Sequence, residues 1–96
     1  MGLVATSELL KALSAPLRLA VVAELVAGPR CVHELVDALS DAGMPVRQPL
    51  LSQHLRSLRA AGAVATERRG QEVAYRLAHD GIARLFAEAT TQAQRS

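Results

Sequence analysis

Residues 50–78, LLSQHLRSLRAAGAVATERRGQEVAYRLA, change from one hydrophobic period to another at Gly62. Before this glycine, Leu51, Leu55 and Leu58 recur at intervals of four and three residues, which predicts one buried stripe on an amphipathic helix. After it the period shortens to two, and two alternating runs flank a short turn, which predicts a β-hairpin. The sequence therefore predicts a helix that leads directly into a hairpin.

The predicted hairpin has both an apolar face and a basic tip. Val73, Tyr75 and Leu77 alternate along its second strand, so these side chains share one face. Arg68 and Arg69 lie beside the turn, where folding requires no arginine. Arginines in such a place suit contacts with phosphates or with a DNA minor groove. The tip is therefore a candidate for contact with nucleic acid.

Helical periodicity also occurs outside this stretch. Pro16 is a typical first-turn residue of a helix, and Gly28 followed by Pro29 is a strong stop signal. Further amphipathic patterns precede and follow that helix. The predicted helices cover residues 7–13, 16–27, 32–42, 48–61 and 80–89.

The helices at 32–42 and 48–61 are joined by the turn-rich segment GMPVRQ, and the second carries polar residues opposite its leucines. Two such helices predict a helix-turn-helix, to which the hairpin adds a wing. The expected fold is mainly α with a small β-hairpin, a winged helix-turn-helix in one domain over residues 1–96. The apolar stripes of the first and last helices lack a partner in so small a domain, so we expect them to form a two-fold symmetric homodimer interface.

Composition and charge agree with a helical, DNA-binding protein. Half of the residues are hydrophobic, yet Tyr75 and Phe86 are the only aromatic ones, which favours a core of packed helices. The net charge of +2 is small, but residues 47–76 hold six arginines against two glutamates. A basic region on an otherwise acidic or neutral chain is typical of a nucleic-acid surface, although a solvated charged face has the same signature.

The sequence gives no sign of export, membrane insertion or catalysis. Cys31 is the only cysteine, so an intrachain disulfide is excluded, and the first residues lack the pattern of a signal peptide. The apolar run 19–26 is interrupted by Glu24 and is too short to span a bilayer. No carboxylate pair, oxyanion loop or phosphate-cradling glycine run occurs. We therefore expect a cytoplasmic protein that is not an enzyme and does not contact a membrane.

The polar face of the second helix has the chemistry that reads DNA. A major groove admits a helix, and arginine, glutamine and serine contact base edges or phosphates there. Gln53 suits adenine, whereas Arg47 or Arg56 suits guanine or a phosphate. His54 either joins this surface or packs at the edge of the domain. The alternative is a protein-interaction module built on the same fold. The candidate DNA-binding residues are Arg47, Gln48, Ser52, Gln53, His54 and Arg56 on the helix or at its start, and Arg68, Arg69 and Gln71 on the wing.

LLSQHLRSLRAAGAV, followed by ERRGQEVAYRLA, resembles the recognition helix and wing of the ArsR/SmtB family of bacterial repressors. LKALSAPLRLAVVAEL is similar to the opening of that family, and the resemblance covers residues 9–89. It implies a dimeric repressor of a double-stranded DNA operator that an effector releases. The segment SDAGMPVRQ is longer than the family's usual turn between the two helices.

The effector that the resemblance implies is a metal ion, such as zinc or another divalent transition metal. CVHELVDAL lies where the family has a cysteine-bearing metal segment, so Cys31 and His33 are the implied ligands, with Asp37 as a third. A second metal site of the family is interpreted as lost, because three of the four matching residues do not ligate metals. Those four residues are His79, Gly81, Gln92 and Arg95.

Other interpretations of Cys31 remain open. It is also consistent with a small buried apolar residue, beside a solvent-facing His33. A thiol at a helix start is a candidate redox sensor, because that position favours the thiolate. The third possibility is a regulator without an effector.

Overall fold

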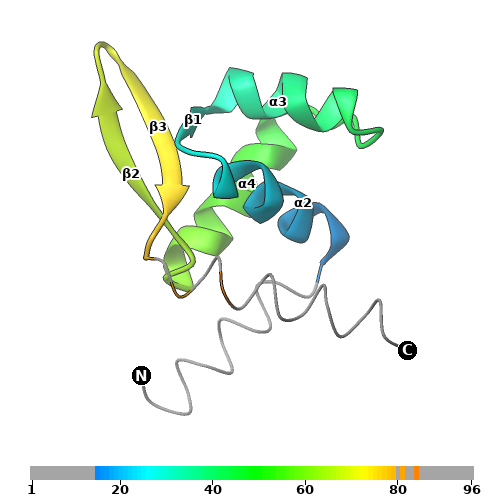
Figure 1. Ribbon diagram of the computed structural model, residues 1–96. Coiled ribbons are helices and arrows are strands. Elements are labelled where there is room, and N and C mark those ends of the chain that lie inside the picture. The colour runs from blue at the N-terminus through cyan, green and yellow to red at the C-terminus, as the bar shows by residue number, and fades with distance from the viewer. Residues whose placement is uncertain (1–14, 80, 82–83, 85–96) are drawn as a thin grey trace.

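The computed structural model describes residues 15–79, 81 and 84. Within them, the helices pack against one another, and a hairpin stands beside them (Figure 1). The sheet is three-stranded and antiparallel, with the strand order β1-β3-β2. The elements in chain order are α2 (Pro16–Val26), β1 (Arg30–Cys31), α3 (Val32–Asp41), α4 (Gln48–Ala60), β2 (Val64–Arg69) and β3 (Glu72–Leu77).

Helix α2 has the bounds that its punctuating residues predict. Ala15 is extended and Pro16 occupies the first turn, where its missing N–H leaves no backbone hydrogen bond unmade. The helix ends at Val26, shortly before Gly28, whose φ of 143° favours glycine. Helix α2 is therefore the helix that the sequence predicts at residues 16–27, and it ends one residue earlier.

Helix α4 ends in a way that starts the hairpin. Gly62 has a φ of 80° and donates its N–H to the carbonyl of Arg59, while Ala63 donates to the carbonyl of Leu58. This pair of bonds is a Schellman motif, which satisfies the last carbonyls of a helix and turns the chain away from its axis. Strand β2 then begins at Val64. The change of period at Gly62 in the sequence is thus a helix cap followed by a strand.

The core is made of aliphatic side chains from all three described helices. The leucine stripe of α4 is fully buried at Leu51, Leu55 and Leu58. Helices α2 and α3 supply apolar partners, and the start of β2 closes the core from the side of the sheet. The remaining members of the core cluster are Val21, Val22, Leu25, Leu35, Leu39, Ala63 and Val64.

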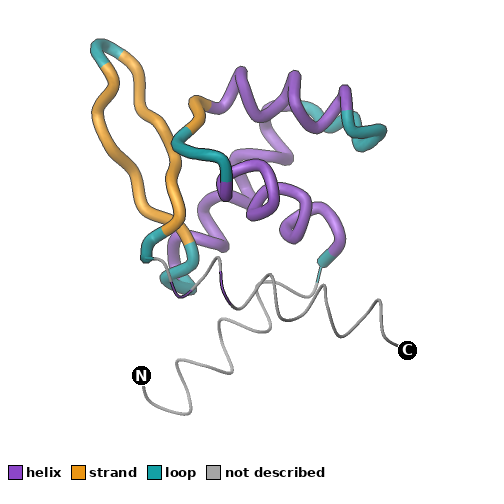
Figure 2. Tube along the Cα trace, in the orientation of Figure 1, coloured by secondary structure: helices purple, strands orange, loops and turns teal. Residues whose placement is uncertain are grey.

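The hairpin of β2 and β3, called the wing below, has a two-residue turn at the place where the sequence predicts a short turn. Arg69 pairs with Glu72, so Gly70 and Gln71 form the turn, and Gly70 has a φ of 65°. The predicted apolar face packs on the core only in part. Tyr75 and Leu77 contact the core, whereas Val73 is 46% exposed. The reason is that the tip extends beyond the helices (Figure 2).

Strand β1 is a feature that the sequence does not predict. Its two residues pair with β3, with Arg30 opposite Tyr75 and Cys31 opposite Ala74. Two residues are too short to show an alternating pattern, and the pairing joins segments far apart in the chain. The consequence is that α3 starts directly beside the wing.

The predicted helix at residues 7–13 lies outside the described residues, as does the predicted helix at residues 80–89 except for Gly81 and Arg84. The dimer interface assigned to these two helices lies outside them as well. Among the helices that are described, none has the length and apolarity needed to cross a membrane.

Candidate nucleic-acid interface

The outward face of α4 carries two of the predicted base-reading residues. A helix turns about 100° per residue, so Gln53 and Arg56 lie on the side opposite the buried stripe of Leu51, Leu55 and Leu58. Both side chains are exposed. Arg47 and Gln48 are also exposed at the start of the helix, whereas Ser52 is partly buried.

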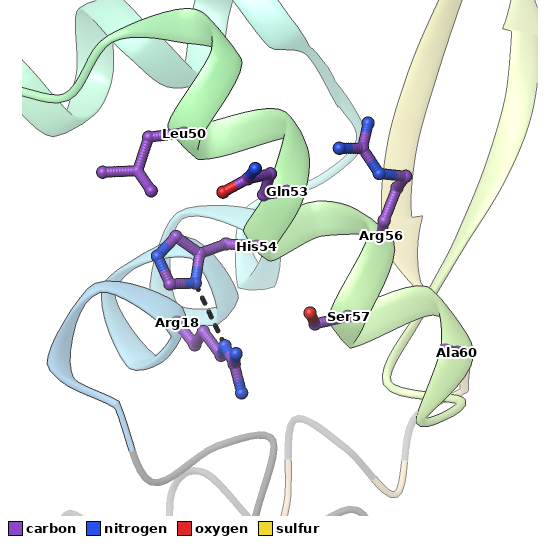
Figure 3. A pocket seen from close by; sticks show the side chains of 7 residues that line it. All are labelled: Arg18, Leu50, Gln53, His54, Arg56, Ser57 and Ala60. Atoms are coloured by element: carbon purple, nitrogen blue, oxygen red, sulfur yellow. Dashed lines mark hydrogen bonds between the residues drawn. The ribbon is translucent and has the colours of Figure 1, made fainter.

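A groove of about 480 Å³ runs along α4 and is walled on one side by α2 (Figure 3). His54 lies in it, partly buried, and its Nδ1 accepts a hydrogen bond of 3.1 Å from Nε of Arg18. None of the described residues that line it is acidic. The lining residues are Arg18, Leu50, Gln53, His54, Arg56, Ser57 and Ala60.

His54 packs against α2 and also lines the same groove as Gln53 and Arg56. Arg18 is the residue that sequence reasoning missed. Its contact with His54 spans 36 positions in the chain, and no local pattern marks it.

The predicted wing residues fall into two groups. Arg68 and Gln71 are exposed near the turn. Arg69 instead donates from Nη1 to Oε1 of Glu34 at 2.5 Å, and the same nitrogen lies 3.8 Å from Sγ of Cys31. Its guanidinium therefore ties the wing to the first turn of α3.

Cys31 is the centre of this tie between the wing and α3. It is 2% exposed, and its thiol donates to Oε2 of Glu72 at 3.2 Å. Its backbone N–H donates to Oε1 of Glu34 at 2.8 Å, which is one half of a capping box at the start of α3. We call Cys31, Glu34, Arg69 and Glu72 the wing junction. The sequence analysis did not identify this junction, although Glu34 lies three residues after the helix N-cap, a spacing that is typical of a capping box.

Burial decides the charge state of the thiol in the wing junction. Burial raises the pKa of Cys31, and its neighbours Glu34 and Glu72 raise it further, although the hydrogen bond from Arg69 acts in the other direction. The backbone hydrogen bond from Cys31 lowers the pKa of Glu34, with help from Arg69. At neutral pH the junction thus holds a neutral thiol and an ionised Glu34. The expectation that the helix start favours a thiolate at Cys31 is wrong, because desolvation outweighs it.

We expect Cys31 to react slowly with alkylating agents. At pH 7.5, iodoacetamide should modify the folded chain at least about tenfold more slowly than the urea-unfolded chain, because only an accessible thiolate reacts. The rate should keep rising as the pH is raised above the ordinary pKa of a cysteine thiol, because folding raises the pKa of Cys31. Because the pKa is raised by folding, the thiol stabilises the fold below its unfolded pKa, and this stabilisation is lost at higher pH. Equal rates for folded and unfolded chains at pH 7.5 would contradict this account.

Two substitutions at Glu34 separate its two contacts. Glu34→Gln keeps an oxygen for the N–H of Cys31 but loses the charge that attracts Arg69. We expect wing amides to exchange with solvent up to about fivefold faster in this variant, since exposed ion pairs contribute little. Glu34→Ala should in addition speed exchange in the first turn of α3. Asp37→Asn, at an exposed position of the same helix, is the control. If the wing amides exchange at the wild-type rate in both Glu34 variants, Glu34 does not tie the wing to α3.

The predicted metal ligands do not form one cluster. Nδ1 of His33 lies 3.9 Å from Oε1 of Glu72, the carboxylate that also accepts from Cys31. Asp37 is exposed further along α3. Across residues 15–79, 81 and 84, no three His, Cys, Asp or Glu side chains are arranged to hold a metal ion. The trio of Cys31, His33 and Asp37 therefore does not fit a closed tetrahedral site, because the thiol turns into the wing junction.

Comparison with known proteins gives this geometry its context. Residues 15–66 match the family described as bacterial regulatory protein, arsR family. The HTH-type transcriptional repressor SmtB of Mycobacterium tuberculosis is 53% identical over 89 residues, which are 93% of this chain and 62% of that protein. The chain thus spans less than two thirds of that curated relative.

Solved structures of regulators share the fold. The transcriptional repressor BigR from Xylella fastidiosa is 38% identical, with a TM-score of 0.76 over 90% of this chain and 83% of that one. The homodimeric winged helix-turn-helix DNA-binding domain of Mb0332 from Mycobacterium bovis, described as a possible ArsR-family transcriptional regulator, is 29% identical. It has a TM-score of 0.85 over 96% of this chain and 81% of that one. The chain is a winged helix-turn-helix protein and belongs to the ArsR family of bacterial regulatory proteins.

Proposed function

We propose that this chain binds double-stranded operator DNA as a homodimer and represses transcription in the bacterial cytoplasm. The observation that carries the proposal is the outward face of α4, where Gln53 and Arg56 are exposed beside a groove whose described lining residues include no acidic one. The names of the relatives, which include repressors and a DNA-binding domain, support it. The homodimer is supported by the described state of the Mycobacterium bovis domain.

In this proposal, α4 enters the major groove and side chains divide between bases and phosphates. Gln53 is suited to adenine, and Arg56 to guanine, because each offers two hydrogen bonds in the geometry of those base edges. The start of the helix carries exposed Arg47 and Gln48, which lie where a recognition helix meets base edges or the backbone. Ser52 and His54, both partly buried, border this surface.

The wing contributes contacts that do not depend on sequence. Arg68 and Gln71 are exposed near the turn and suit phosphates or a minor groove. Arg69 is bound to Glu34, so its main part in DNA binding is to hold the wing in position. A contact between Arg69 and phosphate would compete with that ion pair.

We expect Arg68→Ala to weaken binding to all duplexes alike. Losing one phosphate contact per wing should reduce the slope of log affinity against log salt by about one for each bound protomer. The readout is a salt series on operator and unrelated duplexes. Arg76→Ala is the control, since Arg76 lies at the other end of the wing and bonds the main-chain carbonyls of Leu77 and Ala78. If the salt slope is unchanged in Arg68→Ala, the wing tip does not contact DNA.

We further propose that an effector controls this binding, with zinc or another divalent transition metal as the first candidate. The support is the family resemblance and the closeness of Cys31 and His33 to the shared neighbour Glu72. The described residues offer too few gathered ligands for a complete site, so further ligands would have to come from elsewhere in the dimer.

Fluorescence anisotropy on the upstream DNA, in chelator and then with zinc, tests the effector. A loss of binding with zinc that Cys31→Ser abolishes would establish a metal response. Cys31 would hold zinc as a thiolate, which has no proton to donate to Glu72. Binding that is indifferent to zinc would refute zinc as the effector and favour another metal, an oxidant acting on Cys31, or none.

A further inference from the structure

We propose that Leu50 reads a thymine of the operator by packing on the 5-methyl group that this base exposes in the major groove. The proposal rests on the proposed DNA binding by α4. It adds a residue that determines specificity through an apolar contact, without a hydrogen bond.

Leu50 is an exposed apolar side chain at the start of α4. It is the third residue of the helix, which begins at Gln48, and it is 47% exposed. Its neighbour Leu51 is fully buried, whereas Leu50 is not among the apolar side chains that pack against the described core. A single exposed leucine is ordinary on a protein surface, so exposure alone gives it no function. Its position among the residues of the proposed reading face does.

Leu50 lies on the same side of α4 as Gln53. Residues three positions apart are neighbours on the surface of a helix, and both side chains project from the same side of α4 in Figure 3. Both also line the groove along α4. The N-terminal part of a recognition helix is the part that contacts base edges. A helix that places Gln53 against the bases therefore places Leu50 against them as well.

Thymine is the base that a leucine at this position distinguishes. In the major groove, adenine, guanine and cytosine present hydrogen-bonding groups, and only thymine adds a methyl group. Leucine has no donor or acceptor in its side chain, so it satisfies none of those polar groups. Against the methyl group, both partners lose apolar surface to water, which favours the contact.

The spacing of Leu50 and Gln53 indicates where that thymine lies. The two residues are about 4.5 Å apart along the axis of α4, and stacked base pairs are about 3.4 Å apart. We therefore expect the thymine within about two base pairs of the base that Gln53 reads. An A·T pair offers its adenine to Gln53, and its own thymine or a neighbouring one is then available to Leu50.

Replacing thymine by deoxyuridine tests the contact, because it removes the methyl group and leaves base pairing intact. Each thymine of the operator is replaced in turn, and affinity is measured by anisotropy. For the wild type, we expect about fourfold weaker binding for each contacted methyl group that is removed. Leu50→Ala should bind the thymine and deoxyuridine operators equally well at that position, since the two changes delete the two sides of one contact.

Val26→Ala is the matched control. Val26 is 50% exposed at the end of α2 and does not line the groove, so this variant shortens an exposed apolar side chain elsewhere. It should keep the wild-type response to deoxyuridine. Leu50→Met, which retains an apolar side chain of similar volume, should keep that response too. If Leu50→Ala melts well below the wild type, Leu50→Asn, which is polar and similar in shape, takes its place.

The outcomes separate this inference from the proposed function. If the wild type binds its operator but no deoxyuridine weakens binding, or if the folded Leu50 variant keeps the wild-type response, the thymine contact is refuted while DNA binding stands. If the wild type binds no duplex, both proposals fall. A response to deoxyuridine that is lost in the Leu50 variant and kept in Val26→Ala supports the contact.

Discussion

Leu55→Ala should lower the free energy of unfolding by about 3 kcal/mol, which is typical of a buried leucine that leaves a cavity. Leu55 is fully buried at the middle of α4, within a core that joins α2, α3, α4 and the start of β2. The total free energy of unfolding of a small domain is only about 5–15 kcal/mol, so this one substitution removes a large share of it. Urea unfolding at a fixed protein concentration, which holds any dimerisation constant, is the measurement.

The same helix supplies a matched control. Leu50 is 47% exposed and lies outside the buried stripe, so Leu50→Ala should change the free energy of unfolding by less than about 0.5 kcal/mol. The two variants delete the same atoms from the same helix, and only burial differs. Equal losses of stability in Leu50→Ala and Leu55→Ala would contradict the orientation of α4.

The second large effect concerns the proposed recognition of DNA. Gln53→Ala combined with Arg56→Ala should weaken operator binding at least about thirtyfold, because two lost base contacts cost roughly 1–3 kcal/mol each. Both side chains are exposed, so the melting temperature should hardly change. Anisotropy on operator and scrambled duplexes measures the loss of discrimination.

Arg59→Ala is the control for this double variant. Arg59 is exposed in the last turn of α4 but does not line the groove, so it should leave the preference for operator over scrambled DNA unchanged. If the double variant keeps the full preference for operator over scrambled DNA, Gln53 and Arg56 do not contact the bases.

Local patterns predicted the parts of the fold that are locally determined. Helix α4 starts at Gln48 with a proline in its first turn, and its leucine spacing alone identifies the buried side. The turn of the wing follows from Gly70, since its positive φ suits glycine. In each case the physical cause, a hydrophobic period or a backbone conformation, lies within a few residues of its effect.

Contacts between distant segments were not predictable in the same way. Strand β1 exists because Cys31 pairs with Ala74, and Arg69 reaches Glu34 only after the wing has folded back beside α3. The sequence placed Arg69 at the tip and assigned it to DNA, because its position in the hairpin says nothing of an acidic neighbour 35 positions away. The partner of a long side chain such as Arg69 depends on the tertiary structure, which local sequence patterns do not specify.

The metal segment shows the same limit. The spacing of Cys31 and His33 suggested ligands, but spacing does not say which way a thiol points. In the fold, Cys31 turns into the wing junction and is buried there, while His33 stays 61% exposed. The sequence left open whether Cys31 is a ligand or a buried residue. In the fold, Cys31 is a buried residue whose thiol donates to Glu72.

The most direct test of the central claim is the affinity of the wild-type chain for duplex DNA from its own upstream region, measured by anisotropy across a salt series. The account predicts binding in the nanomolar range, at least about a thousandfold tighter than to scrambled DNA, and a steep fall of affinity with salt. Affinity that is weak, independent of salt and equal for both duplexes would contradict it.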